Sequence, residues 1–144
     1  CTGFSKNPAD PFARGGNREA PLFEFLPARF SDIGTPDGFP EYRDPLPNQT
    51  MPYLYYSGYD GTGYVTGEFG NGGLTQPYRT AEAATAPPWK ANSYQIISPG
   101  YDKEYGSGGP YVATGNDHLK TSPPTDRHLE SDNITNFSPA ELQP

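Results

Sequence analysis

Two short polar stretches of this chain carry oxygen-bearing side chains in a pattern that could bind an ion. Asp102 and Glu104 follow the strand-like run Tyr94–Ile97 in a glycine-rich loop, and Asp132 and Asn133 lie further along the chain. Calcium takes six to eight oxygen ligands from carboxylates, amides and backbone carbonyls, on a backbone that can wrap around it. The types and placement of these residues suit a calcium site, but residues of these types in polar loops are more often solvated turn residues, and both interpretations stay open at this point.

Other groups of reactive side chains favour ordinary structural roles. The segment Tyr59–Gly63 resembles a calcium loop, but Asp-Gly is a common turn dipeptide, so a turn is favoured. His118 and His128, with two nearby aspartates, suggest zinc, but they lie in a polar stretch without a cysteine partner and are interpreted as surface histidines. Serines occur beside glycines without a Gly-x-Ser-x-Gly elbow, so the chain is not predicted to be an enzyme.

The elements that position the candidate ligands are short strands. Arg29–Ile33 and Phe39–Arg43 flank the turn sequence Thr35–Gly38, which predicts a hairpin. Met51–Tyr56 is rich in aromatic residues and predicts a third strand. Tyr94–Ile97 then forms the last strand of one antiparallel sheet of three or four strands, and the following Pro-Gly ends it.

Long irregular stretches separate these strands. Residues 1–144 are interpreted as a single domain in which 1–21 form an extended N-terminal segment and 58–88 and 106–130 form long loops. Ordering such loops has a high entropic cost, so we expect them to be contact surfaces between subunits. Only Arg79–Thr85 has helix-forming composition, with a threonine suited to an N-cap.

Composition limits the fold and the partners. The 144 residues include 17 Gly and 18 Pro, while 11 Tyr and 8 Phe supply much of the apolar surface, so a small aromatic core under many loops is expected. The net charge is −7, with 17 acidic and 10 basic residues, and it excludes the basic surface of a nucleic-acid binder. The predicted class is α+β.

Four stretches together resemble a known family. They are Asp37–Pro45, Pro52–Tyr56, Tyr94–Asp102 and Asp132–Phe137. They look like the C-terminal globular region of type IV pilin-like proteins, and most like the prepilin-type proteins abundant in planctomycete-type bacteria, which are related to the major pseudopilin of type II secretion. The resemblance covers most of residues 1–138, and its most specific part is the strand, the Ser-Pro-Gly-x-Asp loop and the later Asp-Asn-Ile.

This resemblance implies a structural subunit of a pilus- or pseudopilus-like helical filament, outside the cell, at its surface or in the periplasm. It implies calcium bound by Asp102 and Asp132, with Ser131 or Asn133 beside the latter and the carbonyl of Pro99 as a backbone ligand. The chain departs from the family in lacking the prepilin cleavage site and the long apolar helix. A separate helical chain is therefore one expected partner. The loop between the two aspartates is also longer than in the compact pseudopilins.

Several alternatives stay open at this point. Cys1, the single cysteine, is interpreted as a truncation point, a lipid-bearing first residue or an intermolecular thiol. Membrane attachment is expected only through a missing N-terminal helix or a lipid on this cysteine. Asn48 and Asn133 begin glycosylation acceptor sequences. The alternative function is a secreted or lipid-anchored glycan-binding module with an aromatic surface formed by Tyr53, Tyr55, Tyr56, Tyr59, Trp89 and Tyr94.

Overall fold

The structure is a computed structural model of the whole chain. It describes residues 5–7, 9–10, 15–20, 24–32, 40–58, 63–65, 67, 69, 73–114, 118–119 and 127–142. The predicted turn at 35–38, the Asp-Gly turn at 60–61 and Cys1 lie outside these residues.

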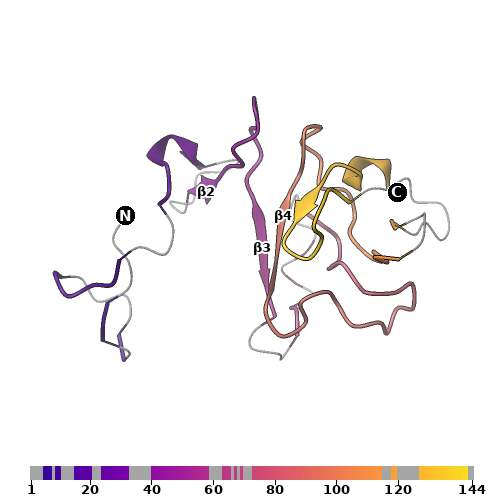
Figure 1. Cartoon of the computed structure of the whole chain (residues 1–144), viewed down its shortest axis with the longest axis horizontal. Coiled ribbons are helices and arrows are strands. Elements are labelled where there is room, and N and C mark those ends of the chain that lie inside the picture. The colour runs from indigo at the N-terminus through magenta and orange to yellow at the C-terminus, as the bar shows by residue number, and fades with distance from the viewer. Residues whose placement is uncertain are drawn as a thin grey trace.

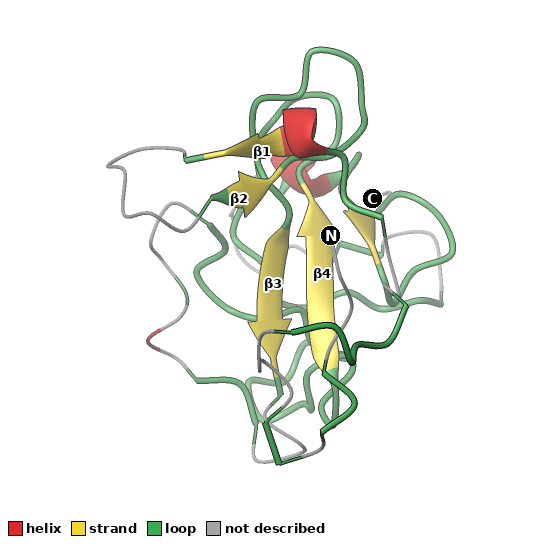
Figure 2. Cartoon of the chain, turned by 90° about the vertical axis from the view of Figure 1, so that its left-hand side faces the viewer, coloured by secondary structure: helices red, strands yellow, loops and turns green. Residues whose placement is uncertain are grey.

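Two small antiparallel sheets form the described fold (Figures 1 and 2). The first pairs β1 (Phe30–Ser31) with β2 (Glu41–Tyr42). The second has the order β3-β4-β5, formed by β3 (Leu54–Ser57), β4 (Tyr94–Ser98) and β5 (Ile134–Thr135). The structure is thus a small β-rich α+β fold, whose helical content is short 3-10 turns such as η1 (Pro27–Arg29) and η4 (His128–Glu130).

The antiparallel pairing predicted from the sequence is confirmed, but the arrangement of the strands differs. The predicted hairpin forms its own two-stranded sheet, which meets the aromatic segment through an isolated antiparallel bridge between Arg43 and Pro52. The strand at Tyr94–Ser98 is central and not last, because β5 pairs with its far edge. Asn136 extends this pairing beyond β5, since its side-chain amide donates to the Tyr94 carbonyl and its side-chain oxygen accepts from the Ile96 amide. Because β5 has only two residues and is continued by the side chain of Asn136, the sequence shows no alternating pattern from which this strand could be recognised.

The helix predicted at Arg79–Thr85 is wrong. The Arg79 amide donates to the Gly109 carbonyl at 2.8 Å, and the Arg79 carbonyl accepts from the Tyr111 amide at 2.9 Å. Thr80 donates both its amide and its hydroxyl to the Pro87 carbonyl, so it closes a turn and does not cap a helix. Long-range pairing of this segment has overridden its helix propensity.

The core lies behind the three-stranded sheet and is small and rich in aromatic residues, as expected. Its buried apolar members are Tyr56, Leu74, Tyr78, Ile97, Tyr105, Tyr111, Leu119 and Leu142. Four of them come from the two stretches predicted to be loops on subunit contact surfaces. Much of the described part of these stretches is therefore packed by the chain itself rather than left to a neighbour.

A buried amide joins one of these loops to the sheet. Gln95, which is 0% exposed, donates to the carbonyls of Tyr78 and Trp89 and accepts from the Tyr78 amide. The Gln95 side chain therefore provides hydrogen-bond partners for backbone groups of Tyr78 and Trp89, which have no neighbouring strand at these positions. Without it, burial of the loop would leave these groups unpaired.

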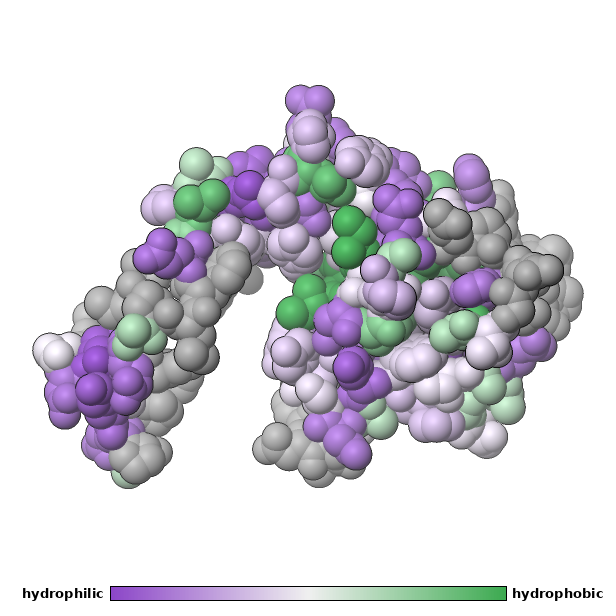
Figure 3. All heavy atoms as spheres, viewed as in Figure 1, coloured by the Kyte–Doolittle hydropathy of each residue, from purple (hydrophilic) through white to green (hydrophobic). Residues whose placement is uncertain are grey.

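The described N-terminal residues lie to one side of this body. Figure 1 shows them separated from the β3-β4-β5 sheet, and Figure 3 shows the molecule hollowed between the two parts. Apart from Ser5 and Arg18, every described residue from 5 to 28 is exposed. The first of them pair locally, through a bridge between Ser5 and Arg18 and a hydrogen bond from the Lys6 amide to the Asn17 carbonyl. Further along, the Leu26 amide donates to the Tyr42 hydroxyl, and the Ala28 carbonyl accepts from the Arg43 side chain.

Candidate functional site

The candidate site begins where β4 ends. Ser98, Pro99 and Gly100 are buried, and Gly100 turns the chain with a φ of 63°. A side chain at this position would collide with the carboxyl group of Asp132, so glycine is required both by the dihedral angle and by the close approach. The Gly100 carbonyl accepts a hydrogen bond of 2.6 Å from the buried side chain of Gln49, which fixes the turn.

Asp132 lies directly against this turn. Its Oδ2 accepts hydrogen bonds from the amides of Tyr101 at 2.5 Å and Asp102 at 3.2 Å. Its Oδ1 is buried and has no hydrogen-bond partner. A buried carboxylate oxygen without a partner is costly, so this atom has unused capacity for a cation or a donor.

Asn133 places a second unused oxygen in the same segment. Its side chain is 0% exposed, and Nδ2 donates to the Tyr105 carbonyl at 3.0 Å and to the Tyr78 hydroxyl at 3.2 Å. Its Oδ1 is buried without a partner. This burial also removes Asn133 from the accessible surface, whereas Asn48, the other glycosylation candidate, is exposed in a left-handed turn.

Asp102 is brought to Asp132 as the sequence predicted. Its Oδ1 accepts the Glu104 amide at 2.8 Å, and its residue is exposed on the loop. Partial burial raises the pKa of Asp102, and the nearby carboxylates of Asp132 and Glu104 raise it further against the opposing effects of the Glu104 amide and of His128. The loop thus holds carboxylates that repel one another.

The remaining predicted ligands lie close by in the chain. Pro99 is buried at the end of β4, and the Ser131 amide donates to the His128 carbonyl at the end of η4. His128, interpreted from the sequence as a surface histidine, lies near enough to Asp102 to lower its pKa. The other histidine, His118, has its ring 5.9 Å from that of Tyr111 and its carbonyl bonded to the Val112 amide. The two histidines therefore serve different parts of the fold.

The side chains at this turn offer the carboxylate and amide oxygens that calcium prefers as ligands. Within the described ranges, no three Asp, Glu, His or Cys side chains are placed to share a metal. An ion here would therefore rely on Asp102 and Asp132 together with amide and backbone oxygens, a donor set that calcium accepts and zinc does not favour. The unpaired oxygens of Asp132 and Asn133 are the structural observations that agree with such an ion.

A buried ion pair beside the site was missed from the sequence. Glu130 is 0% exposed, and its carboxylate receives two hydrogen bonds from Arg127, at 2.9 and 2.5 Å. The same carboxylate accepts from both the amide and the hydroxyl of Ser107, and Arg127 also donates to the Pro110 carbonyl. This pair therefore ties the segment that carries Asp132 to the loop that follows Asp102.

The aromatic residues proposed as a glycan platform are divided by the sheet. Tyr56 is buried, and Trp89 stacks on Phe137 with ring centroids 5.7 Å apart. Tyr55 and Tyr94 lie on the opposite face, where they are 61% and 41% exposed. Tyr59 lies outside the described residues.

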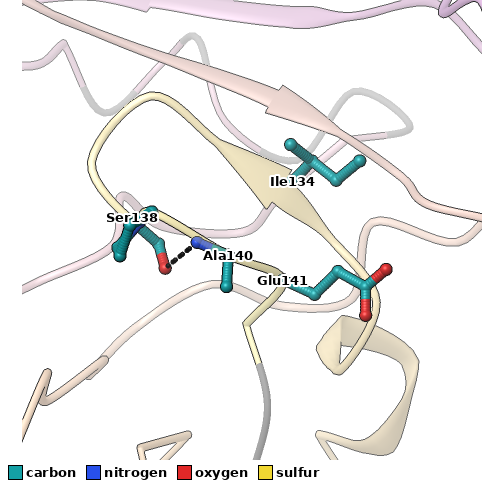
Figure 4. Close-up of a pocket in the computed structure, with 5 residues that line it drawn as sticks. Ile134, Ser138, Ala140 and Glu141 are labelled. Carbon is teal, nitrogen blue, oxygen red and sulfur yellow. Dashed lines mark hydrogen bonds between the residues drawn. The ribbon is translucent and has the colours of Figure 1, made fainter.

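A shallow hollow of about 330 Å³ lies beside β5 (Figure 4). The Ser138 hydroxyl accepts the Ala140 amide at 3.4 Å and shares a hydrogen bond with the Tyr111 hydroxyl at 3.1 Å. The carboxylate of Glu141 points away from this hydroxyl. Ser138 therefore braces the C-terminal turn, and Glu141 is not placed to act as its base.

Comparison of the chain with known protein families, curated proteins and solved structures found no match. In the part of the chain that the structure describes, no helix combines the length and apolar character of a membrane span.

Proposed function

We propose that this chain is a structural subunit of a pilus- or pseudopilus-like filament in the cell envelope or outside the cell. The observation that carries the proposal is the exposed N-terminal part, which lies to one side of the β3-β4-β5 sheet. Ordering a backbone costs about 1–2 kcal/mol per residue, and contacts with neighbouring copies in a filament would offset that cost. The resemblance of four sequence stretches to pilin-like proteins supports the same function.

In this proposal the turn after β4 is a calcium clasp. Asp102 and Asp132 supply the charged ligands, while Asn133, Ser131 and the Pro99 carbonyl complete the expected set. Two observations support it, namely the buried oxygens without partners and the raised pKa of Asp102, to which burial and then the neighbouring carboxylates contribute. Calcium is abundant outside the cytoplasm, so the clasp would close after export and stiffen the part of the subunit that faces solvent.

Electron microscopy of the native material, with gold-labelled antibodies against this chain, tests the proposed function. We expect label along filaments at a regular repeat, and its loss when the gene is deleted. Label spread singly over the envelope, with no filament that depends on this chain, would refute the proposal. Treatment with a calcium chelator then tests the clasp separately from the filament, because we expect the removal of calcium to loosen the outer surface of the filament.

A further inference from the structure

Two exposed tyrosines lie side by side on the face of the three-stranded sheet that points away from the core. In the register of β3 and β4, Tyr55 is opposite Ile96 and Ser57 is opposite Tyr94, so the two tyrosines are diagonal neighbours on one face. Their ring centroids are 5.6 Å apart, and their planes are inclined by 31°. Tyr55 is 61% exposed and Tyr94 is 41% exposed. The sheet therefore holds two phenols in contact where solvent reaches both.

Tyr64 is a third phenol near this pair. Its hydroxyl bonds to the carbonyls of Trp89 and Lys90, at 3.1 and 2.9 Å. Burial raises the pKa of Tyr64 to about 12, and its electrostatic interaction with Tyr55 contributes to the rise. The hydroxyl proton of Tyr64 is thus held by the protein, whereas the more exposed phenols of Tyr55 and Tyr94 can release theirs to water. Chemistry that removes phenolic protons therefore favours the exposed pair.

Oxidation can join two adjacent phenols. A one-electron oxidant removes one electron and one proton from each phenol and leaves two neutral tyrosyl radicals, with high spin density at the carbons ortho to the oxygens. A carbon–carbon bond then forms between one ortho carbon of each ring. The hydrogens on these two carbons move to the phenolic oxygens, which restores both phenols. Hydrogen peroxide, acting through a haem peroxidase, accepts the two electrons and two protons and is reduced to two molecules of water.

We infer that Tyr55 and Tyr94 are an oxidative cross-linking site, at which hydrogen peroxide and a haem peroxidase join β3 to β4 through a dityrosine bond. Exposed side chains change rotamer within nanoseconds, so the two ortho carbons can meet without movement of the strands. Neither strand contains a cysteine, so a disulfide cannot make this connection. The bond closes the chain from Tyr55 to Tyr94 into a covalent loop, which restricts the unfolded state as a disulfide does. This site depends neither on the calcium clasp nor on filament assembly.

Oxidation of the full chain at low concentration, with a haem peroxidase and hydrogen peroxide, tests the inference. We expect a monomer that has lost two hydrogen atoms, shows the fluorescence of dityrosine, and yields on digestion a linked peptide pair containing Tyr55 and Tyr94. This monomer should melt about 5–15 °C above the untreated protein. The same linked peptides should be present in protein isolated from its native source.

Substitutions of single hydroxyl groups supply the controls. Tyr55→Phe and Tyr94→Phe should each abolish the linked monomer, because phenylalanine has no phenolic proton to lose. Tyr101→Phe is the matched control: Tyr101 is 64% exposed but follows the end of β4, so its replacement should leave the product unchanged. Circular dichroism of each variant verifies that it is folded.

Five results would overturn the inference. A linked monomer that persists in Tyr94→Phe, or a linked peptide that joins Tyr55 to Tyr64, would show that the wrong partner was assigned. Dityrosine formed only between copies of the chain would make this face a contact between molecules. An unchanged melting temperature of the linked monomer would remove its stabilising role. Native protein without the linked peptides would show that the pair is not oxidised where the protein works.

Discussion

Replacing Glu130 by Gln should destabilise the protein more than any change on its surface. The glutamine would keep the size of the side chain but remove the charge that faces Arg127, whose side chain is 4% exposed. Breaking a buried ion pair from one side costs about 3–5 kcal/mol, because it leaves the other charge buried without compensation. That is a large share of the about 5–15 kcal/mol that stabilises a typical domain.

Urea unfolding of three variants beside the wild type would test this expectation. Glu130→Gln should lose about 3–5 kcal/mol of unfolding free energy, whereas the combined Arg127→Met, Glu130→Leu variant should lose less, because no lone charge remains. Glu82→Gln is the control: this glutamate is exposed, and its replacement should change stability by no more than about 0.5 kcal/mol. A loss below about 1 kcal/mol in Glu130→Gln would refute the role given to the pair.

Three further predictions follow from the site and the core. Gly100→Ala should unfold at a much lower temperature than wild type because of its positive φ and its contact with Asp132, whereas Gly16→Ala, with open space around it, should melt close to wild type. Burial raises the pKa of Tyr78 well above its ordinary value of 10.0, so stability should be intact below about pH 10 and fall as the pH rises further, which tyrosinate absorbance and circular dichroism followed together would detect. Asp102→Asn should melt slightly higher than wild type in chelator at neutral pH. The pKa of Asp102 is raised in the folded protein, so its ionisation lowers stability as the pH rises from 3.8 through that raised pKa. A clear drop in the melting temperature of the variant would contradict the repulsion between the carboxylates.

The strand and turn that carry the site could be predicted from local sequence. Two consecutive isoleucines favour a strand, and Pro99-Gly100 ends it in a way that few other dipeptides do. The approach of Asp132 to this turn was inferred from its oxygen-bearing side chain and from the family resemblance, and not from any periodic pattern. Glycine at position 100 is the local residue that permits this approach.

The buried polar groups could not be predicted in the same way. Arg127 and Glu130 are three residues apart and look like an ordinary surface pair. In the fold, Ser107 and Pro110 bond to this pair and the Tyr78 ring lies beside Arg127, so the pair is interior. Gln95 has no distinctive neighbours in sequence, yet it bonds to a loop residue 17 positions away. Such partners are set by the tertiary fold, and the pairing of Arg79 that replaced the predicted helix has the same origin.

The calcium dependence of unfolding tests the central claim most directly. Wild-type protein would be unfolded by heat and by urea in chelator, in excess magnesium and in calcium. At a calcium concentration about 100 times the dissociation constant, the clasp predicts a gain of about 2.7 kcal/mol that magnesium does not reproduce and that Asp132→Ala abolishes. Unfolding of the wild-type protein that is identical in calcium and in chelator would contradict the clasp.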